Sequence, residues 1–277
     1  MAVDPRLLWA LGMLSLCGLF FWVSLLLPSS STPRMRDGWR WLQWRPLPYD
    51  LPTWMGLGVI GALLLQYLYV QVVLAGGERS FPPGIHILVS ILCFQGFLTA
   101  ILFFRMRMAK IDVPEALGMD SPFQLREVTA GFVGYCMSLP LVVIAGLMTQ
   151  GLYHVLDWEI KAQPMLDDFT QTAGWMNWLT LFFLVGFIGP LLEEVVFRGF
   201  LFSWFRQKMG IHLGLWMQAV VFAFVHQYGA GFFPLMALSL VLGLAYVYSQ
   251  RLMVCVWIHS FFNVVTLVNV VLSGELS

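Results

Sequence analysis

The sequence predicts an all-α fold, namely a polytopic bundle of about eight transmembrane helices. Hydrophobic residues make up 59% of the 277-residue chain, and its mean hydropathy is +0.79. Charged residues make up only 11%, whereas soluble domains carry about 25%. The apolar residues also form long runs, and a run of about 20 residues can cross the bilayer as a helix. These observations favour a membrane protein over a soluble domain.

The apolar runs define the expected spans and two regions of the chain. Residues 1–150 contain four spans and no recognised motif, whereas residues 175–272 contain four more spans and the polar motifs described below. The expected spans are Leu7–Leu27, Trp54–Leu74, Ile85–Phe104, Val128–Gln150, Trp175 to about Phe205, Leu213–Tyr228, Pro234–Tyr248 and Leu252–Leu272. The first run is too long for the apolar core of a signal peptide, so we expect it to be retained.

Basic residues in the loops predict the orientation of the chain. They are Arg34, Arg36, Arg40 and Arg45 in the first loop, Arg105, Arg107, Lys110 and Arg126 after the third span, Arg206 and Lys208 after the fifth, and Arg251 before the last. All fall on one side if the N-terminus is outside, and the positive-inside rule makes that side cytoplasmic. We therefore expect a multi-pass plasma (inner) membrane protein with its N-terminus outside. The net charge of zero gives no indication of a nucleic acid partner.

Two carboxylates and a guanidinium interrupt the fifth apolar run. Glu193, Glu194 and Arg198 lie in the stretch GPLLEEVVFRG, and ionisable groups at membrane depth are costly enough to suggest function. Residues four apart share a helix face, whereas adjacent residues point about 100° apart. We therefore expect Glu194 to pair with Arg198 and Glu193 to face a partner on another helix. Because Pro190 suits a first helical turn, we also expect a new helical segment to start there, with Glu193 near its N-terminus.

Polar residues on two later spans are expected to meet Glu193. His226 follows Phe222 by one turn, and His259 and Asn263 are four residues apart, on one face. Counted from the basic ends of their helices, these groups lie roughly 12–20 Å deep, similar to Glu193. Such a cluster can hydrolyse a peptide bond. Glu193 would be the general base, assisted by His226, and His259 and Asn263 would donate to the oxyanion.

Other interpretations of the same residues remain open. A satisfied polar network can hold membrane helices together without catalysis, as in a scaffold or immunity protein. Glu193, His226 and His259 have the ligand types of a zinc site with an open position. A proton or ion pathway is a further alternative, although the sequence contains no inverted repeat typical of transporters. No Ser or Cys stands in a nucleophile motif, so we expect no acyl-enzyme.

The motifs EExxxR, FxxxH and HxxxN, in this order, resemble those of the CPBP family of CAAX proteases and bacteriocin-processing enzymes. Here they are Glu193-Glu194-x-x-x-Arg198, Phe222-x-x-x-His226 and His259-x-x-x-Asn263, and the resemblance covers about 175 to 271. It implies a glutamic-type intramembrane protease without metal or cofactor, related to the Ras-converting CAAX prenyl endopeptidase. Glu194 and Arg198 would support the geometry of the other four residues, and the resemblance implies a cavity that opens toward the cytoplasm. The substrate would be a membrane-associated peptide, such as a lipidated or bacteriocin-like one.

Overall fold

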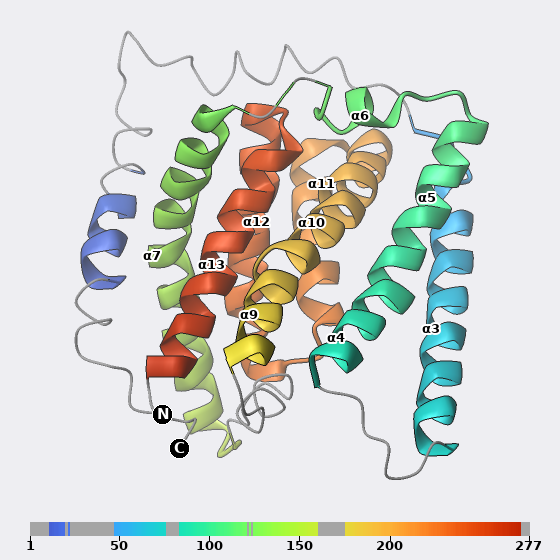
Figure 1. Cartoon of the computed structure of the whole chain (residues 1–277). Helices are drawn as coiled ribbons and strands as arrows, with labels where there is room; N and C mark the ends of the chain where they lie inside the picture. The colour runs from blue at the N-terminus through green and yellow to red at the C-terminus, as the bar shows by residue number, and fades with distance from the viewer. Residues whose placement is uncertain are drawn as a thin grey trace, which may run out of the picture.

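The structure, a computed structural model, confirms the all-α polytopic fold. It describes residues 11–19, 22, 47–75, 83–120, 122, 124–159 and 175–272, and no strand occurs among them. Long helices lie side by side across the molecule, with α3 and α5 at one edge and α7 toward the other (Figure 1). The helices that follow residue 175 lie between these edges.

The elements of the described part follow one another along the chain, and several of them are segments of one longer helix. In order they are α3 (Leu51–Ala75), α4 (Pro83–Ile91), η1 (Leu92–Gly96), α5 (Phe97–Met108), α6 (Val113–Ala116), α7 (Leu125–Val155), α9 (Trp175–Phe183), η2 (Leu184–Ile188), α10 (Gly189–Glu194), η3 (Val195–Phe202), α11 (Ser203–Val225), η4 (Gly229–Gly231), α12 (Phe232–Ser249) and α13 (Leu252–Leu272). The segments η1, η2 and η3 are π-helical turns inside longer helices. Such turns are often found at functional sites.

Six helices in the described part of the chain are long and apolar enough to cross a membrane. One of them, Trp178–Val225, is 48 residues long and turns back at Gly210, whose φ of 82° favours glycine. This stretch therefore supplies two of the expected spans. The first expected span, Leu7–Leu27, lies mostly outside the described residues.

The expected new helix start at Pro190 is wrong. Ile188, just before α10, is helical (φ −68°, ψ −46°), so the helix continues from α9 through η3 without a break. The N–H of Gly189 donates to the carbonyl of Leu184, which is a π-type bond. This shifted register accommodates a proline, which has no N–H to donate. Glu193 therefore lies within a helix and not near a helix N-terminus.

Small residues bring the helices around the centre into close contact. A Cβ atom added to Gly131 of α7 would lie 2.3 Å from the Cβ of Trp257 on α13. A Cβ added to Gly243 of α12 would lie 2.6 Å from the Leu215 side chain on α11. Close backbone approach through small residues is typical of membrane helix packing. It places α11, α12 and α13 near enough for their polar side chains to meet.

Ion pairs join the helices at the basic end of the bundle. Arg105, near the end of α5, donates to both carboxylate oxygens of Asp50 just before α3, with the shortest distance at 2.6 Å. These hydrogen bonds hold the pKa of Asp50 below its ordinary value of 3.8. Arg251, before α13, donates to Glu127 of α7 at 2.6 Å. The first ion pair joins α5 to the start of α3, and the second joins α7 to the start of α13.

We expect Asp50→Asn to lower the melting temperature at pH 7 by no more than a few degrees, because a partly exposed ion pair contributes little. The folded pKa of Asp50 is lower than the unfolded one, so its stabilisation is present above the unfolded value and is lost as the pH falls through the folded value. Thermal unfolding of parent and variant in detergent should therefore differ at pH 7 and converge under acidic conditions. A difference that persists unchanged to pH 2 would argue against the ion pair as its cause.

Candidate active site

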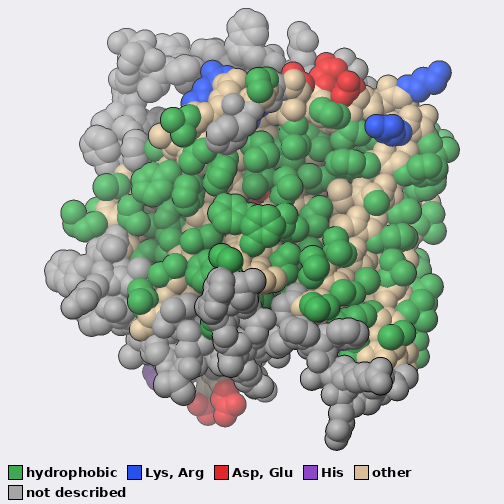
Figure 2. Space-filling model, viewed as in Figure 1, with side chains coloured by type: hydrophobic (Ala, Val, Ile, Leu, Met, Phe, Trp, Pro, Cys, Tyr) green, Lys and Arg blue, Asp and Glu red, His purple; other side chains and the backbone are tan. Residues whose placement is uncertain are grey.

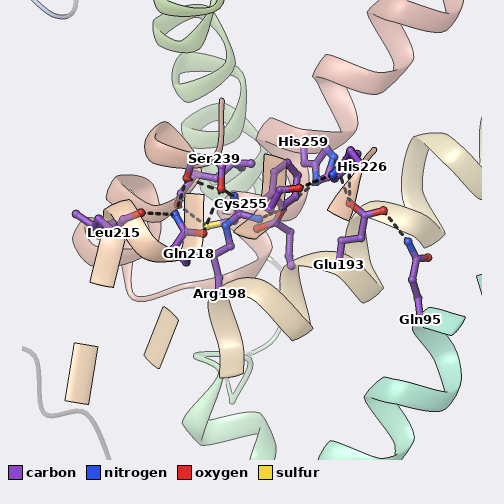
Figure 3. A network of polar contacts seen from close by, with 12 residues as sticks. Gln95, Glu193, Arg198, Leu215, Gln218, His226, Ser239, Cys255 and His259 are labelled. Atoms are coloured by element: carbon purple, nitrogen blue, oxygen red, sulfur yellow. Dashed lines mark hydrogen bonds and ion pairs between the residues drawn. The ribbon is translucent and has the colours of Figure 1, made fainter. Parts of the chain in front are cut away.

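Three stretches of the chain bring the expected polar residues together. Glu193 and Glu194 end α10, His226 directly follows α11, and His259 and Asn263 lie on α13. Figure 3 shows the Glu193 carboxylate with the two imidazoles on one side and Gln95 on the other. Glu193, His226, His259 and Asn263 therefore lie close together around one cavity.

Glu193 faces both imidazoles with one of its oxygens. The Oε2 atom lies 3.8 Å from Nε2 of His226 and 3.9 Å from Nε2 of His259. It is buried and has no hydrogen-bond partner among the described residues. The other oxygen, Oε1, accepts a 2.7 Å hydrogen bond from Gln95. One carboxylate oxygen is thus held in place while the other is left for a ligand between the two rings.

Glu194 and Arg198 form the predicted ion pair, with 3.0 Å between Oε1 and the guanidinium, and both side chains are 0% exposed. The structure adds a contact that helix spacing alone does not predict, because the same Oε1 atom lies 2.8 Å from Nδ1 of His259. Arg198 also donates to the Ser239 hydroxyl at 2.9 Å and lies 4.7 Å from the centre of the Phe222 ring. Glu194 therefore orients the imidazole of His259 and also neutralises the charge of Arg198.

The partners of the two imidazoles fix their tautomers. Nδ1 of His226 lies 2.6 Å from the carbonyl oxygen of Phe222, and a carbonyl only accepts. Nδ1 of His259 lies against the Glu194 carboxylate, which also accepts when ionised. Both Nδ1 atoms must therefore carry the proton. In the neutral rings each Nε2 faces Glu193 as a proton acceptor, and it becomes a donor only in the imidazolium form.

Asn263 lines the cavity but already has a hydrogen-bond partner. Its Nδ2 atom donates to the carbonyl oxygen of Val185 at 2.9 Å. Val185 lies in the π-helical segment η2, where the shifted hydrogen bonding leaves backbone carbonyls available. The amide nitrogen carries two protons, so one remains for another acceptor.

A cavity of about 190 Å³ lies beside these groups. Its polar lining consists of Gln95, Glu193, His226, His259, Asn263 and Thr266. Ligand pockets commonly measure about 300–1,000 Å³, so this cavity is small. It has room for one reacting group and water rather than for a large ligand.

Gln95 lies at the site but belongs to none of the sequence motifs. It comes from η1, within the region to which no motif was assigned. The available signal was a glutamine within the apolar run Ile85–Phe104, since a polar side chain at membrane depth needs a partner. Ser239 and Gln218 were missed in the same way, and they hydrogen-bond to each other at 3.2 Å beside Arg198.

The described residues contain no group of three or more His, Cys, Asp or Glu side chains arranged to hold a metal ion. That Glu193, His226 and His259 bind no metal stays a prediction.

Fold and site together define a class: a multi-pass membrane protein with a buried carboxylate and imidazole site among its helices. Residues 175–265 match the family model described as Type II CAAX prenyl endopeptidase Rce1-like. The predicted resemblance to CAAX proteases is therefore confirmed over this segment. The match ends two residues after Asn263 and includes all six expected site residues.

Part of the chain also resembles a curated bacterial protein. The chain is 33% identical over 132 residues to the UPF0177 protein YbdJ of Lactococcus lactis subsp. lactis (strain IL1403). The match covers 46% of this chain and 54% of the relative, so the chain spans about half the length of the curated relative that it matches. No solved structure matches the chain.

We expect Glu194→Gln to destabilise the protein more than Glu193→Gln does. The first change leaves the fully buried Arg198 without a countercharge, and breaking a buried ion pair typically costs about 3–5 kcal/mol. The second change removes a charge that is partly exposed and has no charged partner in its own helix. Thermal unfolding of the two purified variants in the same detergent gives the comparison. Equal melting temperatures would contradict this division of roles.

Proposed function

We propose that this protein is a glutamic-type intramembrane protease that hydrolyses a peptide bond of a membrane-associated peptide. The observation that carries the proposal is the unpartnered Oε2 of Glu193, which faces two imidazole nitrogens at 3.8 and 3.9 Å within a cavity. A water molecule held there would be in reach of one base and two rings. The Rce1-like match at 175–265 supports the same reaction class.

In the proposed reaction Glu193 takes a proton from water, and the water oxygen forms a bond to the carbonyl carbon of the peptide. His226 orients the water through Nε2. The carbon–nitrogen bond of the tetrahedral intermediate then breaks, and the proton held by Glu193 passes to the leaving amine. General acid–base catalysis of this kind contributes about 10²–10⁴ in rate. No covalent intermediate is needed, since the protein supplies a base and not a nucleophile.

Two donors are available for the oxyanion. His259 can donate from Nε2 in the imidazolium form, with Nδ1 held against the Glu194 carboxylate. Asn263 can donate its second amide proton, while the first holds the side chain against Val185. In a site shielded from water, removing one such donor typically costs about 10²–10³ in rate.

We also infer how the chain divides. Residues 175–272 would form the catalytic region, and residues 1–150 would support it, because the only described contact from a side chain of that region to Glu193 comes from Gln95. The protein would reside in the plasma membrane, where the lipid bilayer surrounds the six helices that can cross it. Neither a cofactor nor a nucleic acid has a role in this proposal.

We expect Glu193→Gln to reduce cleavage of a membrane-anchored reporter peptide by at least about 100-fold while expression and melting temperature stay close to those of the parent. The matched control is Glu159→Gln, which changes an exposed glutamate far along the chain from the site. Cleavage is measured with purified protein in lipid nanodiscs. Unchanged turnover in Glu193→Gln would remove the general-base role, and absence of cleavage by the parent on a broad panel of peptides would favour a scaffold protein.

We expect Gln95→Leu to lower kcat by about ten- to a hundredfold, because a hydrogen bond to a charged group contributes about 1.5–3 kcal/mol. KM should change little, since Gln95 holds the base rather than the peptide. The matched control is Gln66→Leu, which removes another membrane glutamine whose partner is Ser90. Kinetics and melting temperature are measured for both variants. Equal effects on kcat in the two variants would show that membrane glutamines act only through stability.

A further inference from the structure

We propose that a second cavity, where α5 turns into α6 at the basic end of the bundle, binds the phosphate headgroup of an anionic phospholipid. The cavity measures about 660 Å³, and its lining residues all lie between Phe103 and Pro114. It shares no lining residue with the cavity beside Glu193. The two cavities are therefore separate sites, and lipid binding at the second does not depend on the proposed protease activity.

The turn that ends α5 places a lysine in the cavity lining. The N–H of Lys110 donates to the carbonyl of Arg107 at 2.9 Å, and the N–H of Ile111 donates to the carbonyl of Met106 at 3.1 Å. These two bonds form a Schellman motif, which ends a helix with one residue in the left-handed conformation. That residue is Lys110, with φ at 57°.

Glycine is the usual residue at this position of the motif, because a Cβ atom is unfavourable in the left-handed conformation. The sequence thus places a cation at Lys110 where glycine would be less strained. A strained residue that the local fold does not require suggests a role for its side chain, and here the side chain lines a cavity.

The two cations of the lining are available to a ligand. Arg107 and Lys110 are exposed, and neither side chain makes an ion pair or hydrogen bond with another residue in the described part of the chain. The carboxylate of the lining, Asp112, caps α6 by accepting from the N–H of Glu115 at 3.3 Å. The lining therefore carries two cations against one carboxylate that already has a partner, and this excess of positive charge favours an anion.

The cavity lies at the level where lipid headgroups are expected. Figure 2 shows a belt of hydrophobic side chains with Lys and Arg side chains at its upper end, and α5 and α6 meet at that end in Figure 1. Phe104 and Met108 of α5 are 56% and 59% exposed and belong to the apolar surface. They lie on either side of Arg107 in the sequence. A lipid whose acyl chains contact these two residues would have its phosphate close to Arg107 and Lys110.

The apolar part of the lining distinguishes a phospholipid from a free phosphate ion. It consists of Phe103, Ile111, Val113 and Pro114, and the ring of Phe103 contacts the fully buried Phe200 of η3 with the ring centres 6.0 Å apart. Hydrated phosphate gains nothing from such a wall, whereas a glycerol backbone and acyl chains lose contact with water there. The volume also falls within the range of about 300–1,000 Å³ that is common for ligand pockets. An amphiphilic anion therefore fits both halves of the lining.

The net charge of the headgroup decides which phospholipid binds. The guanidinium of Arg107 can donate two parallel hydrogen bonds to a phosphate, and the ammonium of Lys110 supplies a further positive charge. Phosphatidylglycerol presents a phosphate with a net negative charge. Phosphatidylcholine carries its own cation beside the phosphate, and the two protein cations repel that group. The site should therefore select the anionic lipid.

Three variants test the proposal. Lys110→Gly removes the ammonium and supplies the residue that the left-handed position favours, so the melting temperature of the lipid-free protein should stay the same or rise. Arg107→Gln removes the guanidinium of the lining. The matched control is Lys208→Gln, which removes an exposed cation of α11 that does not line the cavity.

Native mass spectrometry of the full-length protein in detergent measures binding of phosphatidylglycerol and of phosphatidylcholine with the same acyl chains. The parent should bind phosphatidylglycerol at least about tenfold more tightly, because two cations face the headgroup. Lys110→Gly and Arg107→Gln should each weaken this binding about fivefold, the contribution of one cation near an anionic lipid, whereas Lys208→Gln should change it less than about twofold.

Equal affinity of the parent for the two lipids would overturn the proposal, because the cations would then not select the headgroup. Equal weakening by Lys208→Gln and Lys110→Gly would also overturn it, since binding would reflect the overall charge of this end and not the cavity. A final titration adds inorganic phosphate at constant ionic strength, and it should leave phosphatidylglycerol bound. Displacement of the lipid would show that the site takes free phosphate and would overturn the assignment to a phospholipid.

Discussion

The buried ion pair between Glu194 and Arg198 is the interaction on which the rest of the site depends. Neither side chain is exposed, and an isolated charge at this depth would be strongly unfavourable. Each charge is therefore satisfied by several partners. Arg198 holds Ser239 of α12, and Glu194 holds His259 of α13. These contacts fix three helices at one level, and the neighbouring Glu193 then points into the cavity because adjacent residues on a helix face different directions.

The pairing of the two glutamates with different partners divides their roles. Glu194 acts through His259, whose ring it orients so that Nε2 faces Glu193. The ring of His226 is oriented by a backbone carbonyl of its own helix. When both rings are neutral, Nε2 of His226 and Nε2 of His259 therefore both face Oε2 of Glu193, and all three atoms are proton acceptors. Such an arrangement is unfavourable unless a proton or a donor such as water lies between the three atoms. Water is also the reactant that the proposed hydrolysis needs at this position.

Much of this arrangement follows from spacing along the chain. Helical periodicity predicts the pair of Glu194 with Arg198, and counting residues from the basic ends predicts that His226 and His259 reach the depth of Glu193. The continuous helix through Pro190 was not predictable by these rules, because a preceding π-helical turn changes the hydrogen-bond register. The contact of Gln95 depends on how η1 packs against α10, and no local pattern encodes that.

The central claim is that Glu193 activates water directly for attack on a peptide carbonyl. A single turnover of a cleavable membrane peptide in ¹⁸O-labelled water, followed by mass spectrometry of product and protein, tests it most directly. The account predicts one ¹⁸O atom in the new carboxyl group of the product and none in the peptide that contains Glu193. Label in the Glu193 carboxylate would show that it acts as a nucleophile and would contradict the general-base mechanism.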